Sequence, residues 1–148
     1  MNQAPVKVSI IIPHHKGETI LYKCLQSIHN TSYSNYEIIV VDNNSKDQSI
    51  LKSKKEFPEI KVLSLEQNLG YAGGCNKGAL EAQGELLLFL NNDTIHEKNW
   101  IEPLIAIMDN DKDIGSVQPK IKNINNNNKF DYAGGSGGFL DIFCYPFT

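Results

Sequence analysis

Four short apolar runs, each followed by a polar segment, constrain the fold of this 148-residue chain more than any other feature. They are rich in Ile, Val and Leu and lie at residues 8–12, 36–41, 60–65 and 86–90. Such runs, bounded by turn residues, are typical of strands buried in a parallel sheet. Apolar residues at helical spacing or polar surface patterns predict helices at 18–30, 46–57, 71–83 and 99–109. Strands that alternate with helices predict an α/β fold with a mostly parallel sheet.

The ends of the outer runs give two more precise expectations. We expect Pro13 to end the first strand at Ile12, because proline has no N–H for the ladder. The run 86–90 is the most apolar, so we expect a buried strand there. The apolar stripe of the first helix consists of Ile20, Leu21, Cys24, Leu25 and Ile28.

The last third of the chain has weaker patterns. Residues 115–121 predict a strand, and the Asn-rich stretch 123–128 is interpreted as an exposed loop. The glycine-rich stretch 134–138 is interpreted as a mobile loop. We expect residues 1–148 to form a single domain, since this length is typical of one compact unit.

Composition excludes several classes of protein. A hydrophobic content of 41% and a charged content of 21% are ordinary for a soluble globular protein. The formal net charge of -3 offers no basic surface for nucleic acid, and no apolar run is long enough to span a membrane. Three cysteines without zinc-site spacing indicate reduced thiols and a cytoplasmic location.

Polar clusters follow the predicted strands and converge in space. Right-handed crossovers place the carboxyl ends of parallel strands at one edge, where such sheets bind ligands. The clusters at residues 14–18, 42–45 and 91–94 fall there, and segment 68–76 can reach the same rim. The sequence therefore predicts a ligand site at this edge. It contains neither a GxGxxG fingerprint after the first strand nor a GxxxxGK[ST] phosphate loop.

Two carboxylates lie just past predicted strands: Asp42 after the second, and Asp93 after the fourth. Partial desolvation of a carboxylate is costly unless a partner compensates it, and a divalent cation or a nucleobase N–H could do so. Mg²⁺ or Mn²⁺ prefers oxygen ligands and often binds between one or two carboxylates and substrate phosphates. The alternative is that each aspartate caps the helix after it.

Four blocks of sequence, in order, are similar to the opening of family 2 glycosyltransferases. They read VSIIIPHHKGE, YEIIVVDNNSKD, NLGYAGGCNKGA and GELLLFLNNDT, and cover residues 7–95. The chain most resembles the bacterial rhamnosyltransferase-like members, which build cell-surface polysaccharides. The later FDYAGGSGGFLDIFCYPF also resembles a segment of these enzymes.

The resemblance implies a GT-A fold, a Rossmann-like three-layer α/β sandwich that binds a nucleoside-diphosphate sugar. The implied partners are a UDP- or dTDP-sugar and a glycan or lipid-linked acceptor, with inverting, metal-assisted transfer and Mg²⁺ or Mn²⁺ as cofactor. The implied ligand of the metal is Asp93, at the DXD position. The implied nucleotide-binding residues are Pro13, Glu18, Asp42, Asn44, Asn68, Gly70, Gly73, Asn76, Asn91 and Asn92.

The sequence departs from the family pattern in two places. Asn91 replaces the first acid of DXD, so we expect the apo protein to bind a cation weakly and the diphosphate to supply coordination. The family's general base lies in an acidic motif that we expect beyond Thr148, in a longer enzyme that could associate with the inner face of the membrane. The alternative function is a non-catalytic nucleotide-sugar-binding or assembly module. A nucleotidyltransferase is disfavoured, because the loop after the first strand supplies only Lys16.

Overall fold

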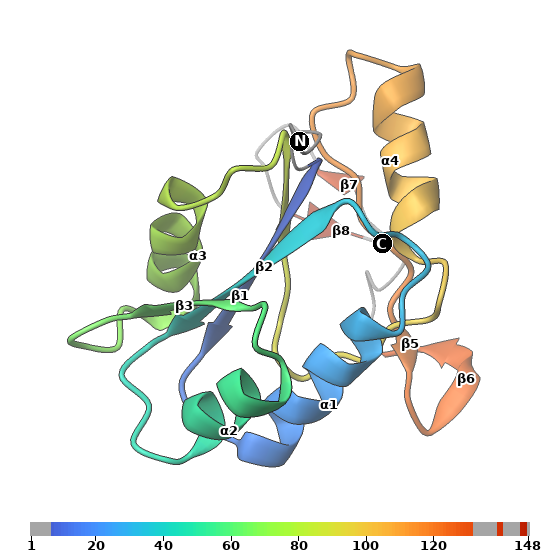
Figure 1. Ribbon diagram of the computed structural model, residues 1–148. Helices are drawn as coiled ribbons and strands as arrows, with labels where there is room; N and C mark the ends of the chain where they lie inside the picture. Colours follow the sequence, from blue (N-terminus) through green and yellow to red (C-terminus); the bar gives the residue numbers. More distant parts are fainter. Residues whose placement is uncertain (1–6, 132–138, 141–145, 148) are drawn as a thin grey trace. The chain divides into compact units, whose positions relative to one another are not determined.

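The computed structural model describes residues 7–131, 139–140 and 146–147 (Figure 1). The chain divides into two compact units, residues 1–98 and 99–148, and each is described by itself. The glycine-rich stretch 134–138, Asp141 and Cys144 lie outside the described residues.

The first unit is built on a parallel four-stranded sheet with the strand order β3-β2-β1-β4. The strands are β1 (Val8–His14), β2 (Tyr36–Asp42), β3 (Lys61–Ser64) and β4 (Leu86–Phe89). All seven residues of β1 are buried, because this strand has a neighbour on both sides. The predicted α/β fold with a parallel sheet is confirmed.

Helices cover both faces of this sheet. They are α1 (Glu18–His29), α2 (Ser49–Glu56) and α3 (Gly70–Leu80). Figure 1 shows α1 and α2 together on one face and α3 on the other, which makes three layers. The side chains of Ile11, Ile39 and Val41 form the core beneath α3.

Two glycines let α3 approach the sheet closely. A Cβ at Gly78 would lie 2.4 Å from Ile11 Cγ2 and 2.9 Å from Val41 Cγ2. A Cβ at Gly74 would lie 3.0 Å from Pro13 Cβ and 3.0 Å from Asn43 Nδ2. Because real Cβ contacts are essentially never shorter than 3.0 Å, a side chain at Gly78 would push the helix outward, and one at Gly74 would be tightly packed against Pro13 and Asn43.

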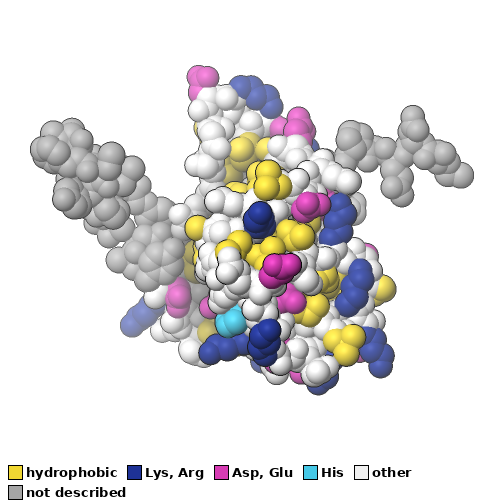
Figure 2. Space-filling model, turned by 90° about the vertical axis from the view of Figure 1, so that its left-hand side faces the viewer, with side chains coloured by type: hydrophobic (Ala, Val, Ile, Leu, Met, Phe, Trp, Pro, Cys, Tyr) yellow, Lys and Arg dark blue, Asp and Glu magenta, His cyan; other side chains and the backbone are white. Residues whose placement is uncertain are grey.

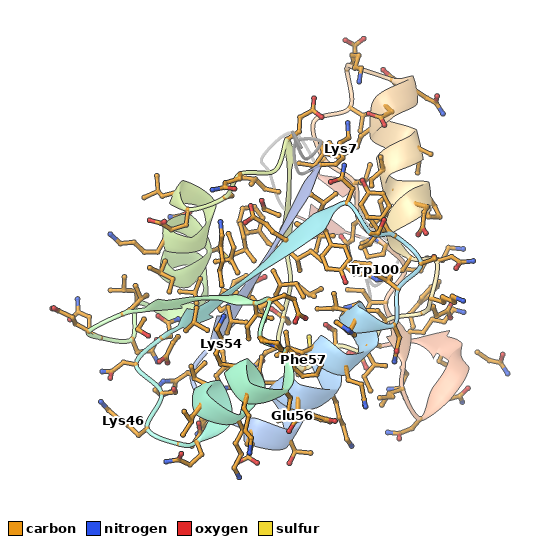
Figure 3. All side chains as sticks on the ribbon, in the orientation of Figure 1. Lys7, Lys46, Lys54, Glu56, Phe57 and Trp100 are labelled. Atoms are coloured by element: carbon orange, nitrogen blue, oxygen red, sulfur yellow. The ribbon has the colours of Figure 1, made fainter. Side chains whose placement is uncertain are left out.

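The carboxyl end of α2 is attached to α1 through Phe57, which is labelled in Figure 3. The Phe57 ring lies 5.7 Å from the Tyr22 ring and 5.8 Å from the His29 ring, measured between centroids. Lys54, labelled beside it, donates from Nζ to the backbone oxygens of Pro58 and Ile60. These contacts satisfy carbonyls beyond the end of the helix.

The prediction that Pro13 ends the first strand is wrong, since β1 continues through Pro13 to His14. The carbonyl of Ile11 accepts from Leu90 on the β4 side, and that of His14 accepts from Asn43 on the β2 side. By the alternation of a strand, the nitrogen of Pro13 faces the side where β4 has already ended. No ladder donor is needed there, so proline is tolerated.

The expected burial of the strand at 86–90 is also wrong. Among the described strands β4 is at the edge of the sheet, and Leu87 and Phe89 are 46% and 47% exposed. Apolar content does not show whether a strand is central or at an edge. Ile20 belongs to the predicted apolar stripe of α1, but it is 46% exposed, whereas Leu21, Cys24, Leu25 and Ile28 are buried.

The second unit contains α4 (Ile101–Asn110) and two short antiparallel pairs. The pairs are β5 (Lys122–Asn123) with β6 (Asn126–Phe130) and β7 (Phe139–Leu140) with β8 (Pro146–Phe147). The predicted strand at 115–121 is absent from these described residues, and Pro119 interrupts any ladder there. The Asn-rich stretch is a hairpin instead of a loop, because the Asn125 N–H bonds Asn123 Oδ1 (3.0 Å) and closes its turn.

None of the helices in the described part of the chain is long and apolar enough to cross a bilayer.

Candidate functional site

The carboxyl ends of the strands lie at one edge of the sheet, as predicted (Figure 1). The registers place His14 opposite Asp42 and Asp42 opposite Ser64. On the other side of β1, Ile11 lies opposite Phe89, so the loop after β4 leaves the sheet at the same edge. The polar segments that follow β1, β2 and β4 therefore form one rim.

Asn43, directly after β2, joins this rim to the start of α3. Its Oδ1 accepts a hydrogen bond from the Leu69 N–H (3.1 Å), and its Nδ2 donates to the Gly70 carbonyl (2.9 Å). Its own N–H donates to the His14 carbonyl (2.7 Å). The residue is only 3% exposed. One buried amide thus fixes where the segment at 68–76 meets the sheet, which confirms that this segment reaches the rim.

Asp42 is half-buried, and its Oδ1 accepts from the Ser45 N–H (2.8 Å). Asn44 between them has a positive φ of 60°, which asparagine tolerates better than most residues. Because α2 begins only at Ser49, Asp42 closes this turn and caps no helix. Asp93 caps none either, since α4 begins at Ile101. The alternative explanation of both aspartates as helix caps is therefore wrong.

A line of polar groups, with His14 and Ser49 buried at its centre, connects the loop after β4 to α2. His14 Nδ1 lies 2.7 Å from Asn92 Nδ2, and His14 Nε2 lies 2.7 Å from Ser49 Oγ. Ser49 Oγ in turn donates to Asp47 Oδ1, and Asp47 Oδ2 accepts from the Gly17 N–H (2.8 Å). Burial lowers the pKa of His14, while hydrogen bonds from Ser49 and Gly17 lower the pKa of Asp47 to about 2.

The same loop is attached to α1 at a second place. The carbonyl of Asn91 accepts from Thr94 Oγ1 (2.8 Å) and from the thiol of Cys24 (3.8 Å). His96 joins Thr94 Oγ1 (3.1 Å) to Ser27 Oγ on α1 (2.8 Å). Burial lowers the pKa of His96 to about 4 and raises that of Cys24 to about 12. The backbone on both sides of Asp93 is therefore fixed.

Asp93 itself is exposed, and its carboxylate accepts no hydrogen bond from the part of the chain that the structure describes. Tyr71, on the first turn of α3, is its neighbour across the rim. Burial, the Cys75 thiol and the Asp93 charge together raise the pKa of Tyr71 to about 12. The described residues contain no cluster of three or more His, Cys, Asp or Glu able to hold a metal ion.

The remaining predicted site residues lie in different environments. Glu18 points to α2, where Lys52 Nζ contacts both of its carboxylate oxygens (2.7 and 2.8 Å). Asn68 is exposed, and its Oδ1 accepts from the Gly70 N–H (2.8 Å). A Cβ at Gly73 would lie 2.6 Å from Leu69 Cβ, and Asn76 is exposed on α3.

The roles of Asn43, His14 and Ser49 in building this rim were not predicted from the sequence. For Asn43 the available signal was a polar residue directly after an apolar strand, but only the fold reveals that its side chain turns inward. Ser49 begins α2 and follows no strand. On the face shown in Figure 2, Lys side chains are scattered among Asp and Glu and form no continuous basic patch among the described residues.

A three-layer α/β unit with polar groups gathered at the carboxyl edge of a parallel sheet belongs to the class of proteins that bind ligands at that edge. The profile of Glycosyl transferase family 2 matches residues 9–140, which is most of the chain. This chain therefore belongs to glycosyl transferase family 2.

Individual relatives agree with this assignment. An uncharacterized glycosyltransferase of Haemophilus influenzae is 29% identical over 126 residues, covering 85% of this chain and 42% of the relative. The UDP-Glc:alpha-D-GlcNAc-diphosphoundecaprenol beta-1,3-glucosyltransferase WfgD of Escherichia coli is 34% identical over 103 residues, covering 68% of this chain and 40% of the relative.

Among solved structures, TarS of S. aureus (residues 1–349) in complex with UDP-GlcNAc superposes with a TM-score of 0.64 and 28% identity. The match covers 70% of this chain and 31% of that one. The four-stranded parallel sheet thus has the GT-A fold. The chain spans less than half the length of these three proteins.

Proposed function

We propose that this chain binds the nucleoside diphosphate of a UDP- or dTDP-sugar at the rim, for inverting transfer of the sugar to a glycan or lipid-linked acceptor. The observation that carries the proposal is the state of Asp93. Its carboxylate is exposed and accepts no hydrogen bond from the described residues, although the backbone on either side of it is fixed. A charged group presented on a fixed loop is suited to an incoming ligand.

The donor atoms of this loop suit Mg²⁺ or Mn²⁺, which prefer oxygen ligands. Asp93 offers a carboxylate and Asn91 an amide oxygen, while the Asn92 amide is bonded to His14. Two protein ligands leave positions for the diphosphate oxygens and water. When bound, the cation would neutralise charge on the leaving nucleoside diphosphate. The chain has no arginine to hold a diphosphate through a guanidinium, which favours this arrangement.

The nucleoside would lie along the ends of β1 and β2. One oxygen of Asp42 closes the turn to Ser45, and the other would accept the ring N–H of a pyrimidine. Pro13 and Asn44 would line the pocket, and Glu18 would reach the base or ribose while paired with Lys52. The remaining contacts to the nucleoside and diphosphate would come from Asn68, Gly70, Gly73, Asn76 and Asn92.

In the transfer, the acceptor hydroxyl oxygen would attack the anomeric carbon as the bond from that carbon to the diphosphate oxygen breaks. The hydroxyl proton would pass to a general base. None of the rim residues is assigned that role. A binding module without transfer would bind the nucleotide in the same way, and a transfer assay distinguishes the two functions.

Calorimetric titration of UDP and dTDP, with and without Mn²⁺, tests the proposal. We expect Mn²⁺ to tighten binding of at least one nucleotide by about tenfold or more, and Asp93→Ala to remove that gain. Glu81→Ala is the matched control, since it removes the same charge from an exposed position at the far end of α3. Absence of binding in either condition, or a gain unchanged in Asp93→Ala, would contradict the proposal.

A further inference from the structure

Each hydrogen bond in the polar line from Asn92 to Asp47 has a defined donor and a defined acceptor. Asp47, with a pKa of about 2, is an ionised acceptor at neutral pH, so the Ser49 hydroxyl must donate to it. Ser49 Oγ can then only accept from His14 Nε2, which places the ring proton on that nitrogen. In the neutral ring His14 Nδ1 is left as an acceptor, and the Asn92 amide must donate to it.

The two central members of this line are buried. His14 is 1% exposed and Ser49 is fully buried. A buried donor or acceptor without a partner is costly, so each group restricts the orientation of the next. The half-buried amide of Asn92 is the last member, and Asp93 follows it in the chain. The hydrogen bonds of the buried groups therefore orient Asn92, the residue beside the exposed carboxylate of Asp93.

We propose that His14 is a positioning residue that, through its hydrogen bond with Asn92, orients the loop so that Asp93 meets a cation bound with the diphosphate. The inference rests on the proposed function and adds a residue that touches neither ligand. The other contacts of the loop hold the Asn91 carbonyl and the Thr94 hydroxyl, and none of them reaches the Asn92 side chain. Without His14 the side chain of Asn92 has no contact that determines its direction among the described residues.

Two substitutions at position 14 separate positioning from packing. In His14→Asn the amide can place its oxygen near the former Nδ1 and accept from Asn92. In His14→Gln the longer amide can place its nitrogen near the former Nε2 and donate to Ser49, but it leaves Asn92 without its acceptor. Each variant keeps one of the two bonds, so a purely structural role predicts similar losses for both.

The measurement is the ratio of UDP dissociation constants without and with Mn²⁺, for both variants and wild type. We expect His14→Asn to keep the wild-type ratio within about twofold. We expect this ratio to fall about tenfold in His14→Gln, which is the lower end of the loss of metal affinity seen when groups that orient metal ligands are removed. Metal-free UDP affinity should stay within about threefold in both. His29→Gln is the control, since His29 is an exposed histidine on α1 paired with Glu59 (3.2 Å).

Equal ratios in the two variants, or a fall in metal-free affinity that accounts for the whole loss, would overturn the positioning role. A wild-type ratio of one is a different result, because it refutes the metal-bridged donor itself and the inference with it. If the variants at position 14 do not fold, Ser49→Ala serves instead, because it removes the acceptor that keeps the ring proton of His14 on Nε2. It must lose part of the Mn²⁺-dependent gain and keep metal-free affinity, and an unchanged gain or loss of both would contradict the proposal.

Discussion

Asn43 and Asp93 both follow strands of the same sheet, at the same edge, and the structure treats them in opposite ways. Asn43 is 3% exposed, and its side chain makes two hydrogen bonds to the start of α3. Asp93 is exposed, and its carboxylate has no hydrogen bond to the described residues. The comparison separates groups that build the rim from groups that the rim presents. Substitution of the first kind should cost stability, and substitution of the second kind should cost binding.

The largest loss of stability is expected where α3 meets the sheet. In Gly78→Ala the new Cβ would lie 2.4 Å from Ile11 Cγ2, so the helix must shift. We expect the free energy of unfolding to fall by about 3 kcal/mol, the upper part of the usual range for overpacking. Urea denaturation measures it, with Gly115→Ala as control, since a Cβ there has no neighbour within 4 Å. Equal stability of the two variants would contradict the close approach of α3.

Removal of the Asn43 side chain should cost slightly less. Asn43→Ala leaves the Leu69 N–H and the Gly70 carbonyl without their partner. We expect a loss of about 2 kcal/mol, typical of an unsatisfied buried group, and weaker UDP binding because the start of α3 moves. The exposed counterpart is Asn68→Ala, which should lose less than about 1 kcal/mol. The contrast between the two asparagines fails if Asn68→Ala is the more damaging.

Low pH should weaken the attachment of the loop after β4 to α1, which is made through His96. Its pKa is about 4 in the folded protein and about 6.5 when unfolded, so the unfolded state takes up the proton first. The stability that depends on neutral His96 is complete above pH 6.5 and is lost as the pH falls from 6.5 to 4. Between pH 7 and 4.5, we expect the free energy of unfolding to fall by about 1–2 kcal/mol less in His96→Gln than in wild type. Parallel stability curves would show that His96 does not titrate in this way.

The smallest effect on stability is expected at Asp93. Because the carboxylate is exposed and accepts no hydrogen bond from the described residues, Asp93→Ala should change the free energy of unfolding by no more than about 0.5 kcal/mol. A loss above about 1 kcal/mol in urea would place Asp93 among the groups that build the rim.

The sequence patterns predicted the alternation of strands and helices and the common rim, because both follow from apolar periodicity and the handedness of crossovers. They did not predict the edge position of β4, since Leu87 and Phe89 are as apolar as the residues of a central strand. Nor did they separate Asn43 from Asn44. Both are asparagines after β2, and only the backbone turn decides which side chain enters the core.

The ring of Pro13 has a consequence for the opening of the rim. After Leu90 donates to Ile11, the next rung between β1 and β4 would need an N–H at residue 13 to reach the carbonyl of Leu90. Proline has none, so no rung can form beyond the end of β4, and the chain leaves the sheet just before Asn91. The hydrogen-bonded part of the sheet beneath the rim therefore ends at the nitrogen of Pro13.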